Sequence, residues 1–437
     1  MLLNAFFKHR GGNFATLSAI VLPLMLFGVG ASVDYGLAVH ANQKLKAAAE
    51  AAVLGAVSEA QQAFISQENV DLNELIKSTA KALFEANVGS IAQTDVTALR
   101  VVPMVNKNEI SARIDYDATY TTSLVKALGY KEIQISNNAR SVVNVRSFIN
   151  ISFLMDVSAS MGIGATAADQ QILANTINCA FACHIDEARG NSKYDKARAA
   201  GADMRIDVAR DAAMAAVDAS EETEEYDDQV SFGIYKFSNE LTTVMSHKDA
   251  RASDGSYVKS QLQNGIQMDM TNGGTNIENA LKTLSNTLPK SGMGLRADDR
   301  IQYVVVLTDG VESGQAWTKA RDWFLHSATK TNTPYKTHAG HEVNYALNTS
   351  ACDKLKTKDV ETYIIYTEYM KPAYGAFSQH DKDRFAFVTN SLFPIIPTRF
   401  TACTGDAEHV IHADTPEEIK TKFTDIVRSL SAPLRLY

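Results

Sequence analysis

A long uncharged run near the N-terminus limits what this chain can fold into more than any other feature. Between Arg10 and Asp34 lie 23 residues without a charged side chain, GGNFATLSAIVLPLMLFGVGASV. A helix of about 20 apolar residues spans roughly 30 Å of hydrocarbon, and it satisfies its own backbone hydrogen bonds there. The run therefore predicts one transmembrane helix, over residues 14–33.

The charges that flank this run predict its orientation. Lys8 and Arg10 precede it, and Asp34 follows it directly. Basic residues stay on the cytoplasmic side of a membrane helix, so we expect a cytoplasmic N-terminus and an exported remainder. A cleaved signal peptide is the alternative, with Gly36-Leu37-Ala38 as its small-residue site. The run is longer than the apolar core of about 7–15 residues that such peptides carry, which favours a retained anchor.

Composition excludes one class of partner. The chain has 437 residues, 45% of them hydrophobic, which is enough for several domains with cores of their own. Its formal net charge is −8, and no basic stripe alternates with aromatic residues. We therefore expect no nucleic-acid partner.

Small residues recur at helical spacing just after the uncharged run. They predict a helical stalk with a face that lets another helix approach closely. Either a separate protein or the chain's own domain can cover this face. Its members are Leu37, Ala41, Leu45, Ala48, Ala52 and Ala56.

The rest of residues 34–147 predicts a small α+β region. A second helix is expected over residues 72–87, ended by Gly89, because glycine readily adopts the left-handed conformation that ends helices. Apolar and polar residues alternate strictly over residues 110–120, with RVVPMV before them and EIQIS and SVVNV after them. A period of two is typical of strands, so we expect an antiparallel sheet over residues 97–146 with a turn at 106–108.

From Phe148 onward, short apolar strands alternate with amphipathic helices. That order is typical of an α/β fold with a doubly wound parallel sheet covered on both faces. The expected strands are NISFLM, VSFGIYKF, IQYVVVL and ETYIIYT, and the expected helices span residues 203–219, 276–288 and 416–430. We expect this domain to occupy residues 148–437, with insertions near 163–202 and 312–357.

Oxygen-bearing side chains lie at or beyond the ends of these strands. Asp156, Ser158 and Ser160 occupy alternate positions in DVSAS, and Asp309 ends a strand in VVVLTDG. Thr275 lies in the loop NGGTN, just before a helix. The carboxyl ends of parallel strands meet at one edge of the sheet, so we expect the five side chains to gather there. Carboxylates and hydroxyls are hard ligands, which suit Mg²⁺, Mn²⁺ or Ca²⁺.

The five residues have different expected roles in this metal site. We expect direct contacts from Ser158, Ser160 and Thr275, while Asp156 and Asp309 supply charge largely through bound waters. A cation with few direct carboxylates stays electrophilic, so an acidic residue of a partner protein can complete its coordination. The alternative is the same fold with a site that is empty in use, since a fold alone does not fix function.

Two segments resemble known families. The DVSAS, GGT and TDG motifs resemble the metal-ion-dependent adhesion site of von Willebrand factor type A domains, and the similarity spans residues 148–430. The segment HRGGNFATLSAIVLPLMLFGVGASVDYGLAVHANQKLKAAAEAAVLGA resembles the TadE/TadG-type N-terminal segment of the Flp, or tight-adherence, pilus machinery. Prepilin processing would want a glutamate five residues after the cleavage glycine. Counted from Gly12 that position is Leu17, so we do not expect the chain to be trimmed and polymerised as a pilin.

The resemblance implies a function in binding rather than catalysis. It implies a bacterial inner-membrane protein with a single pass and a metal-dependent domain in the periplasm. This protein would assist the assembly or anchoring of an Flp-type pilus by contacting a protein partner, and it would need no small-molecule substrate. The alternative is an adhesin or scaffold of another envelope complex.

Four cysteines lie in the part of the chain that we expect to be exported, where an even number favours disulfides. They are Cys179, Cys183, Cys352 and Cys403, and three pairings are possible. The resemblance to bacterial A domains implies a bond between Cys352 and Cys403, which leaves Cys179 with Cys183.

Two other chemical readings fit the motifs poorly. CAFACH places Cys179 and Cys183 before His184, but the usual signature of covalent haem attachment has two residues between the cysteines, and here there are three. A haem protein is therefore a remote alternative. Ser158 and Ser160 lack the glycine pattern of a nucleophile elbow, and no histidine is placed by sequence to act as a base. We therefore expect no enzymatic activity.

Overall fold

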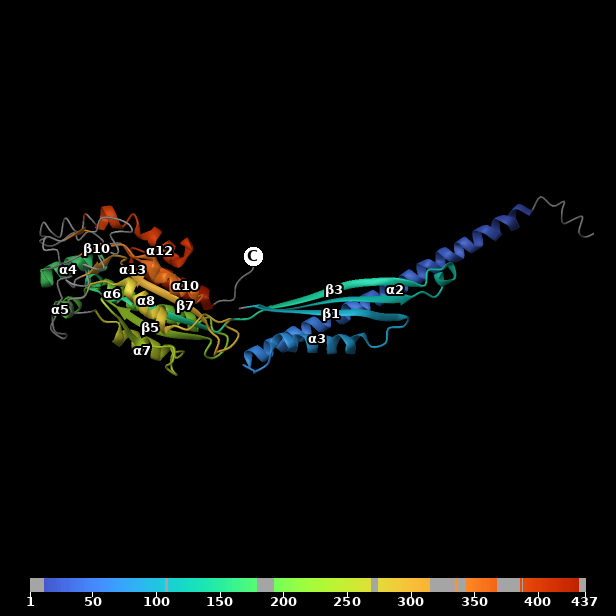
Figure 1. Cartoon of the computed structure of the whole chain (residues 1–437), viewed down its shortest axis with the longest axis horizontal. Helices are drawn as coiled ribbons and strands as arrows, with labels where there is room; N and C mark the ends of the chain where they lie inside the picture. The colour runs from blue at the N-terminus through green and yellow to red at the C-terminus, as the bar shows by residue number, and fades with distance from the viewer. Residues whose placement is uncertain are drawn as a thin grey trace, which may run out of the picture. The chain divides into compact units, whose positions relative to one another are not determined.

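The structure, a computed structural model, describes residues 12–106, 109–178, 192–268, 274–314, 335–336, 343–367, 386 and 388–431. The chain forms two compact units, Met1–Val145 and Arg146–Tyr437 (Figure 1). Each unit is built on its own main sheet, three-stranded in the first and six-stranded in the second. Cys179, Cys183 and His184 lie outside the described residues, as does the second of the two expected disulfides.

Helix α2, Gly12–Ile65, holds the uncharged run and the small-residue face that follows it. Large apolar side chains of its first half point outward, with Leu24 at 65% and Leu26 at 69% exposure. By length and composition α2 can cross a membrane, and only 11% of its most apolar stretch is buried inside the fold. The N-terminal apolar helix predicted from the sequence is therefore confirmed.

The small-residue face of α2 packs within its own unit. It contacts α3, Leu72–Val88, and the second and third strands of the sheet. A side chain added at Gly55 would meet Leu83 of α3 at 2.5 Å, so the two helices approach closely. The chain's own domain therefore covers this face, and Leu37, 45% exposed, does not belong to it. The buried members are Ala41, Leu45, Ala48, Ala52 and Ala56.

The sheet of the first unit is antiparallel, in the order β1-β2-β3. Its strands are β1 Thr94–Asn106, β2 Glu109–Thr121 and β3 Glu132–Asn144. The apolar residues that alternate along β2 are buried, as their period of two predicts. EIQIS and SVVNV form one strand, β3, because the ladder with β2 continues unbroken from Glu132 to Asn144. Helix α3 ends at Gly89, as expected, and this glycine has a positive φ of 52°, but its ψ of −134° is not that of the left-handed helical conformation. Residues 107–108 of the expected turn lie outside the described part.

The second unit is built on a six-stranded sheet in the order β12-β11-β7-β4-β5-β6. All neighbouring pairs are parallel except β5 and β6. The chain runs from β4 to β5 on one side and later returns to β7 on the other, so its direction of winding reverses at β4. The strands are β4 Ile149–Asp156, β5 Val230–Phe237, β6 Leu241–Met245, β7 Ile301–Thr308, β11 Glu361–Tyr366 and β12 Val410–His412.

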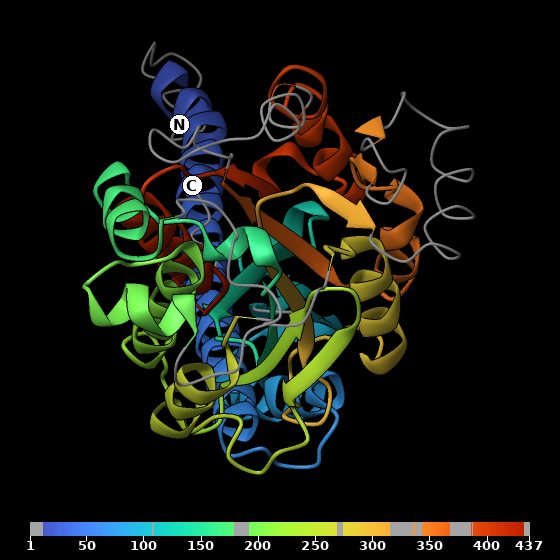
Figure 2. The same ribbon diagram turned by 90° about the vertical axis from the view of Figure 1, so that its left-hand side faces the viewer.

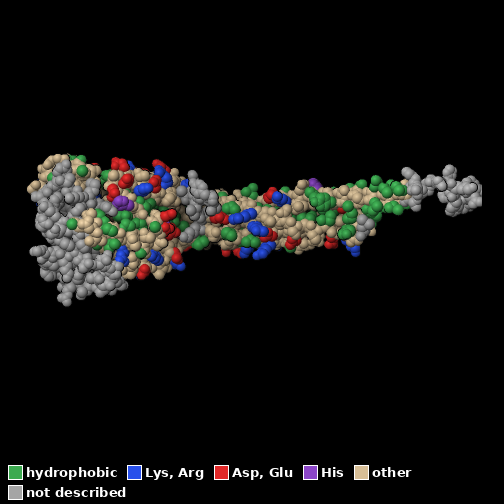
Figure 3. Space-filling view, turned by 90° about the horizontal axis from the view of Figure 1, so that it is seen from above, with side chains coloured by type: hydrophobic (Ala, Val, Ile, Leu, Met, Phe, Trp, Pro, Cys, Tyr) green, Lys and Arg blue, Asp and Glu red, His purple; other side chains and the backbone are tan. Residues whose placement is uncertain are grey.

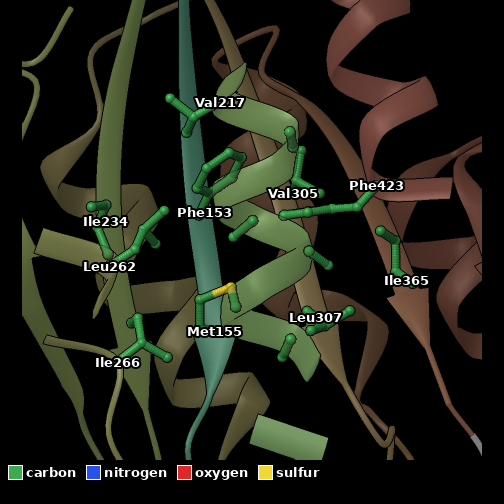
Figure 4. Close-up of a cluster of buried hydrophobic side chains, with 14 of the residues drawn as sticks. Phe153, Met155, Val217, Ile234, Leu262, Ile266, Val305, Leu307, Ile365 and Phe423 are labelled. Atoms are coloured by element: carbon green, nitrogen blue, oxygen red, sulfur yellow. The ribbon is translucent and has the colours of Figure 1, made fainter. Parts of the chain in front are cut away.

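Helices cover both faces of this sheet (Figure 2). One face packs against α6 Arg205–Glu221, α7 Gly255–Gly265 and α13 Pro416–Ser431. The other packs against α8 Ile277–Thr287, α10 Asp353–Thr357 and α12 Ile396–Thr404. The predicted α/β class with a doubly wound parallel sheet is therefore confirmed. In the first core the ring centroid of Phe153 lies 5.3 Å from that of Phe232 on β5. On its other side it lies 5.0 Å from that of Phe423 on α13 (Figure 4).

The described part of the chain also holds shorter elements. Helices α4 Ala167–Ile177 and α5 Lys193–Ala199 fall within the first expected insertion, and a small sheet in the order β8-β10-β9 falls within the second. Its strands are β8 Glu312–Gly314, β9 Tyr335–Lys336 and β10 Val343–Tyr345. The short helical turns are η1 Val125–Leu128, η2 Ala159–Gly162, η3 Thr349–Cys352, η4 Val388–Leu392 and η5 Ala407–His409.

A disulfide joins Cys352 at the end of η3 to Cys403 on α12, with the two Cα atoms 5.2 Å apart. The resemblance implied this bond, and the structure contains it. Both cysteines are buried beside the sheet, at 1% exposure each. The bond closes a loop with a sequence separation of 51 residues.

Replacing Cys352 with serine opens this loop. We expect the free energy of unfolding to fall by about 4 kcal/mol, because the unfolded chain regains the entropy of a long loop. Chemical denaturation measures the change, and in the denatured, non-reduced variant a thiol reagent should detect one new free thiol, that of Cys403. Ser350→Ala, an exposed neighbour on η3, serves as the control and should leave stability nearly unchanged. Reaction of Cys352 with the reagent in the folded wild type would contradict the assignment.

Candidate metal centre

Asp156 is the last residue of β4, the central strand at which the winding reverses. Its carboxylate is 1% exposed and is held from two sides. The backbone N–H of Ser158 donates to Oδ1 at 2.9 Å, and the hydroxyl of Thr308 on β7 donates to Oδ2 at 2.7 Å. The carboxylate is therefore fixed at the carboxyl edge of the sheet, where ligands of such folds bind.

The two serines that follow Asp156 lie together in a tight turn. The backbone continues from β4 into η2, and the hydroxyl oxygens of Ser158 and Ser160 are 3.1 Å apart. Ser158 is buried, while Ser160 is partly exposed. The spacing of two thus brings the oxygens of Asp156, Ser158 and Ser160 to one place, as the sequence predicts.

Asp309 reaches the same edge from the neighbouring strand. It follows β7 directly, is fully buried, and accepts the backbone N–H of Val311 at 3.2 Å. Gly310 allows the sharp turn after it, with φ 80° and with Ile396 and Phe400 near the place of a side chain. Thr308, which bonds to Asp156, precedes Asp309 in the chain, so β7 brings the two carboxylates to adjacent strand ends.

Thr275 enters from a third loop. Its N–H and C=O bond to the backbone of Ser313 on β8, at 3.0 and 2.9 Å. At Gly274, which precedes Thr275, the loop backbone runs close to β8. A Cβ atom added there would lie 2.1 Å from the carbonyl oxygen of Ser313. Within the described part of the chain, the Thr275 hydroxyl makes no hydrogen bond to the other four predicted residues. Residues 269–273 of this loop lie outside that part.

The electrostatics of this edge suit a cation. Burial, together with the negative charge of Asp309, raises the pKa of Asp156 to about 7. A cation between the two carboxylates would favour their ionised forms and reverse this shift. The donor set of carboxylates and hydroxyls has the hardness that Mg²⁺, Mn²⁺ and Ca²⁺ require. The predicted residues therefore fit a hard divalent cation.

Sequence reasoning missed three residues that position the centre. Thr308 orients Asp156, and the hydroxyl of Ser313 accepts the N–H of Thr275 at 3.0 Å. Glu312, fully buried, accepts the N–H of Glu278 at 2.9 Å near the N-terminus of α8. Burial and the nearby carboxylate of Glu278 raise the pKa of Glu312 well above its usual range. All three lie within four residues of Asp309, so the TDG motif was the sequence signal that could have pointed to them.

Two family models match the chain. Residues 12–61 match the model described as putative Flp pilus-assembly TadE/G-like. Residues 205–364 match the von Willebrand factor type A domain. The chain contains an A domain. Together with the TadE/G-like segment, this domain matches a TadG-like pilus-assembly protein.

The matched range of the A domain includes Thr275 and Asp309 but begins after Asp156, Ser158 and Ser160. These three residues nevertheless lie on and beside β4, which pairs with β5 and β7 of the matched range. The sheet therefore extends the A domain back to β4. The assignment of the DVSAS residues to the centre rests on this pairing and on the hydrogen bond from Thr308.

Solved structures similar to the chain include two pilus proteins and a protein of the mussel byssus. The pilus adhesin SpaC from Lactobacillus rhamnosus GG is 11% identical, with a TM-score of 0.36 over 77% of this chain and 34% of that one. Proximal thread matrix protein 1 from the mussel byssus, with a zinc-occupied MIDAS motif, is 16% identical with a TM-score of 0.35, over 65% and 48%. The PilB minor pilin from Streptococcus sanguinis is 11% identical with a TM-score of 0.36, over 78% and 79%.

The chain spans about a third of the first of these proteins and about half of the second. Because all three TM-scores lie below 0.5, none of these likenesses supports an assignment. No curated protein matches the chain.

Proposed function

We propose that this chain is a single-pass inner-membrane protein whose A domain binds a pilus component through a divalent cation. In this proposal residues 14–33 cross the membrane, the N-terminus is cytoplasmic, and the rest lies in the periplasm. The A domain occupies residues 148–437, and residues 34–147 link it to the membrane helix. The observation that carries the proposal is the gathering of buried carboxylates and hydroxyls at the switch point of an A domain sheet.

The exposure of α2 supports the membrane part of the proposal. The described leucine, isoleucine and methionine side chains of the uncharged run are more than half exposed, for example Leu17 at 64%, Ile20 at 63% and Met25 at 63%. In water such a continuous apolar surface is costly, whereas lipid chains cover it without cost. Lys8 and Arg10 before the helix and Asp34 after it favour a cytoplasmic N-terminus.

The residues of the candidate centre support a binding role. A hard divalent cation, when bound, supplies the positive charge that attracts a partner's carboxylate. Ser158, Ser160 and Thr275 offer neutral oxygens as direct ligands, so that charge is only partly neutralised. Asp156 and Asp309 hold the surrounding waters and fix the cation at the sheet edge. Ser160, partly exposed, lies on the side from which a partner can approach. These oxygens bind and orient, and no step of bond cleavage is assigned to them.

Photocrosslinking in living cells tests the partner contact. One glutamate precedes β5 and another follows it, so the two lie at opposite ends of this strand. Replacing each in turn with a photoreactive residue gives two variants that can be compared directly. Glu240 is exposed and follows β5 near the candidate centre, and Glu225 precedes β5 at the other edge. We expect a covalent product with a pilus component from position 240 alone, because only that edge carries the centre. Mass spectrometry identifies the captured protein.

The dependence of this product on the centre is the decisive control. Asp309→Asn keeps the size of the side chain but removes its charge, so the product from position 240 should disappear while the chain remains in the membrane fraction. Equal products from both positions, or a product that persists in Asp309→Asn, would contradict the proposal. Capture of an envelope protein unrelated to pili would instead favour the alternative of a scaffold for another complex.

A further inference from the structure

The loop between β2 and β3 lies against the apolar part of α2. It comprises residues 122–131 and contains the turn η1. A side chain placed on Gly30 would lie 3.1 Å from Cβ of Leu124, so Leu124 packs directly on the backbone of α2 at that point. Gly30 belongs to the proposed membrane segment, and it lies four residues, or about 6 Å of helix rise, before Asp34. The loop thus extends back to the level of the membrane segment.

Asp34 fastens this loop to α2. Its carboxylate is fully buried and accepts three backbone N–H groups, those of Ser123 at 3.0 Å and of Leu124 and Val125 at 2.8 Å each. A buried carboxylate is tolerated when charge-assisted hydrogen bonds satisfy it, and three such bonds fix the start of η1 against the helix. The position of the loop on α2 is therefore set by the first charged residue after the apolar run.

The outward side of the same loop is amphipathic. Leu124 is 50% exposed and Tyr130 is 72% exposed. Lys126 and Lys131 are also exposed. Tyrosine is enriched at the boundary between lipid and water, and lysine extends its ammonium group toward lipid phosphates while its stem stays in the apolar layer. This composition matches the headgroup region of a bilayer. Figure 3 shows hydrophobic side chains gathered along the N-terminal part of α2.

We propose that the loop of residues 122–131 is a second membrane contact, which inserts Leu124 and Tyr130 into the headgroup region of the leaflet from which α2 emerges. The inference rests on the proposed membrane anchor. Its consequence is that the first unit is held to the bilayer at two points, the helix and the loop, so that this unit cannot tilt freely relative to the membrane. Lipid is the favoured occupant because the loop continues the surface of the membrane segment and carries exposed lysines.

Tryptophan quenching by brominated lipids tests this contact on the full-length chain. The protein is placed in vesicles of phosphatidylcholine and phosphatidylglycerol, with or without bromine on the acyl chains. Leu124→Trp and Tyr130→Trp add a reporter to the loop, and the wild type supplies the background of the two native tryptophans. We expect the added emission to be lost in brominated vesicles at both positions. Asn138→Trp, exposed on β3, is the matched control and should keep its emission.

A fourth variant separates failure of this inference from failure of the membrane anchor. Leu24→Trp places the reporter within the apolar run, and its emission should be quenched whenever α2 crosses the bilayer. Quenching at position 24 without quenching at 124 and 130 overturns the loop contact and leaves the anchor intact. Aqueous iodide quenches tryptophans that face water. If neither iodide nor brominated lipid quenches the tryptophans at 124 and 130, protein covers the loop, which also overturns the inference. An unquenched Leu24→Trp refutes the anchor itself.

Discussion

Asp156→Ala should weaken binding of Mg²⁺ or Mn²⁺ by about 10–100-fold, the loss expected when a group that orients metal-bound waters is removed. The carboxylate supplies charge at the centre, and the Thr308 hydroxyl and the Ser158 N–H hold it in place. Without it the DVSAS segment would offer a cation only the neutral hydroxyls of Ser158 and Ser160. Calorimetry on the detergent-solubilised full-length chain measures the change in affinity.

Two control variants separate lost charge from lost structure. Asp156→Asn keeps an oxygen for the Ser158 N–H, so it should fold like the wild type and still bind metal weakly. Asp211→Ala removes a carboxylate that is 61% exposed on α6, and metal affinity should not change. Equal affinity in the wild type and Asp156→Asn would remove Asp156 from the centre. If metal affinity is lost but the crosslink from position 240 is unchanged, the metal site is correct. Its proposed role in partner binding would then be wrong.

The sequence predicted those parts of the fold that depend on local patterns. The uncharged run predicts the first half of α2, because a long stretch without charges is typical of an apolar helix. The period of two predicts β2, because burial of one face of a strand requires an apolar residue at every second position. Strands β6 and β12 escaped prediction for the opposite reason. LTTVM is a short edge strand with two exposed threonines, and VIH has three residues, so neither carries a clear apolar pattern.

The partner of the small-residue face of α2 was likewise not predictable. A face of alanines indicates that something approaches closely, but it has no feature that selects a neighbour. Only the fold shows that α3, β2 and β3 cover it.

The sequence predicted which residues form the candidate centre, but not the hydrogen bonds and backbone pairings that position them. Neighbouring parallel strands end at the same edge of a sheet, so the sequence alone could place Asp156 and Asp309 close together. The bond from Thr308 depends on the register between β4 and β7, in which Met155 pairs with Leu307. The pairing of Thr275 with Ser313 depends on the path of β8. Register and path are set by packing across the whole sheet, so no local motif specifies them.

Phe153→Ala should destabilise the second unit by about 3–5 kcal/mol, the usual cost of removing a buried phenylalanine from a core. Phe153 is fully buried on the central strand β4 and contacts Phe232 and Phe423 from two other elements. Its removal leaves a cavity between the sheet and α13 that the surrounding backbone cannot close. Phe153→Leu fills most of that space and should cost clearly less.

Hydrogen exchange of the full-length chain localises this loss. Because the two units have separate cores, backbone amides of β4 and β7 should exchange faster in Phe153→Ala, while those of β2 keep their protection. The free energy of local unfolding, measured by exchange, should fall in β7 as well as in β4. The two strands are hydrogen-bonded to each other along nearly their full length. Equal losses in β2 and β4 would mean that the units unfold together, which would refute their independence. Unchanged protection in β7 would show that Phe153 does not support the sheet as its contacts indicate.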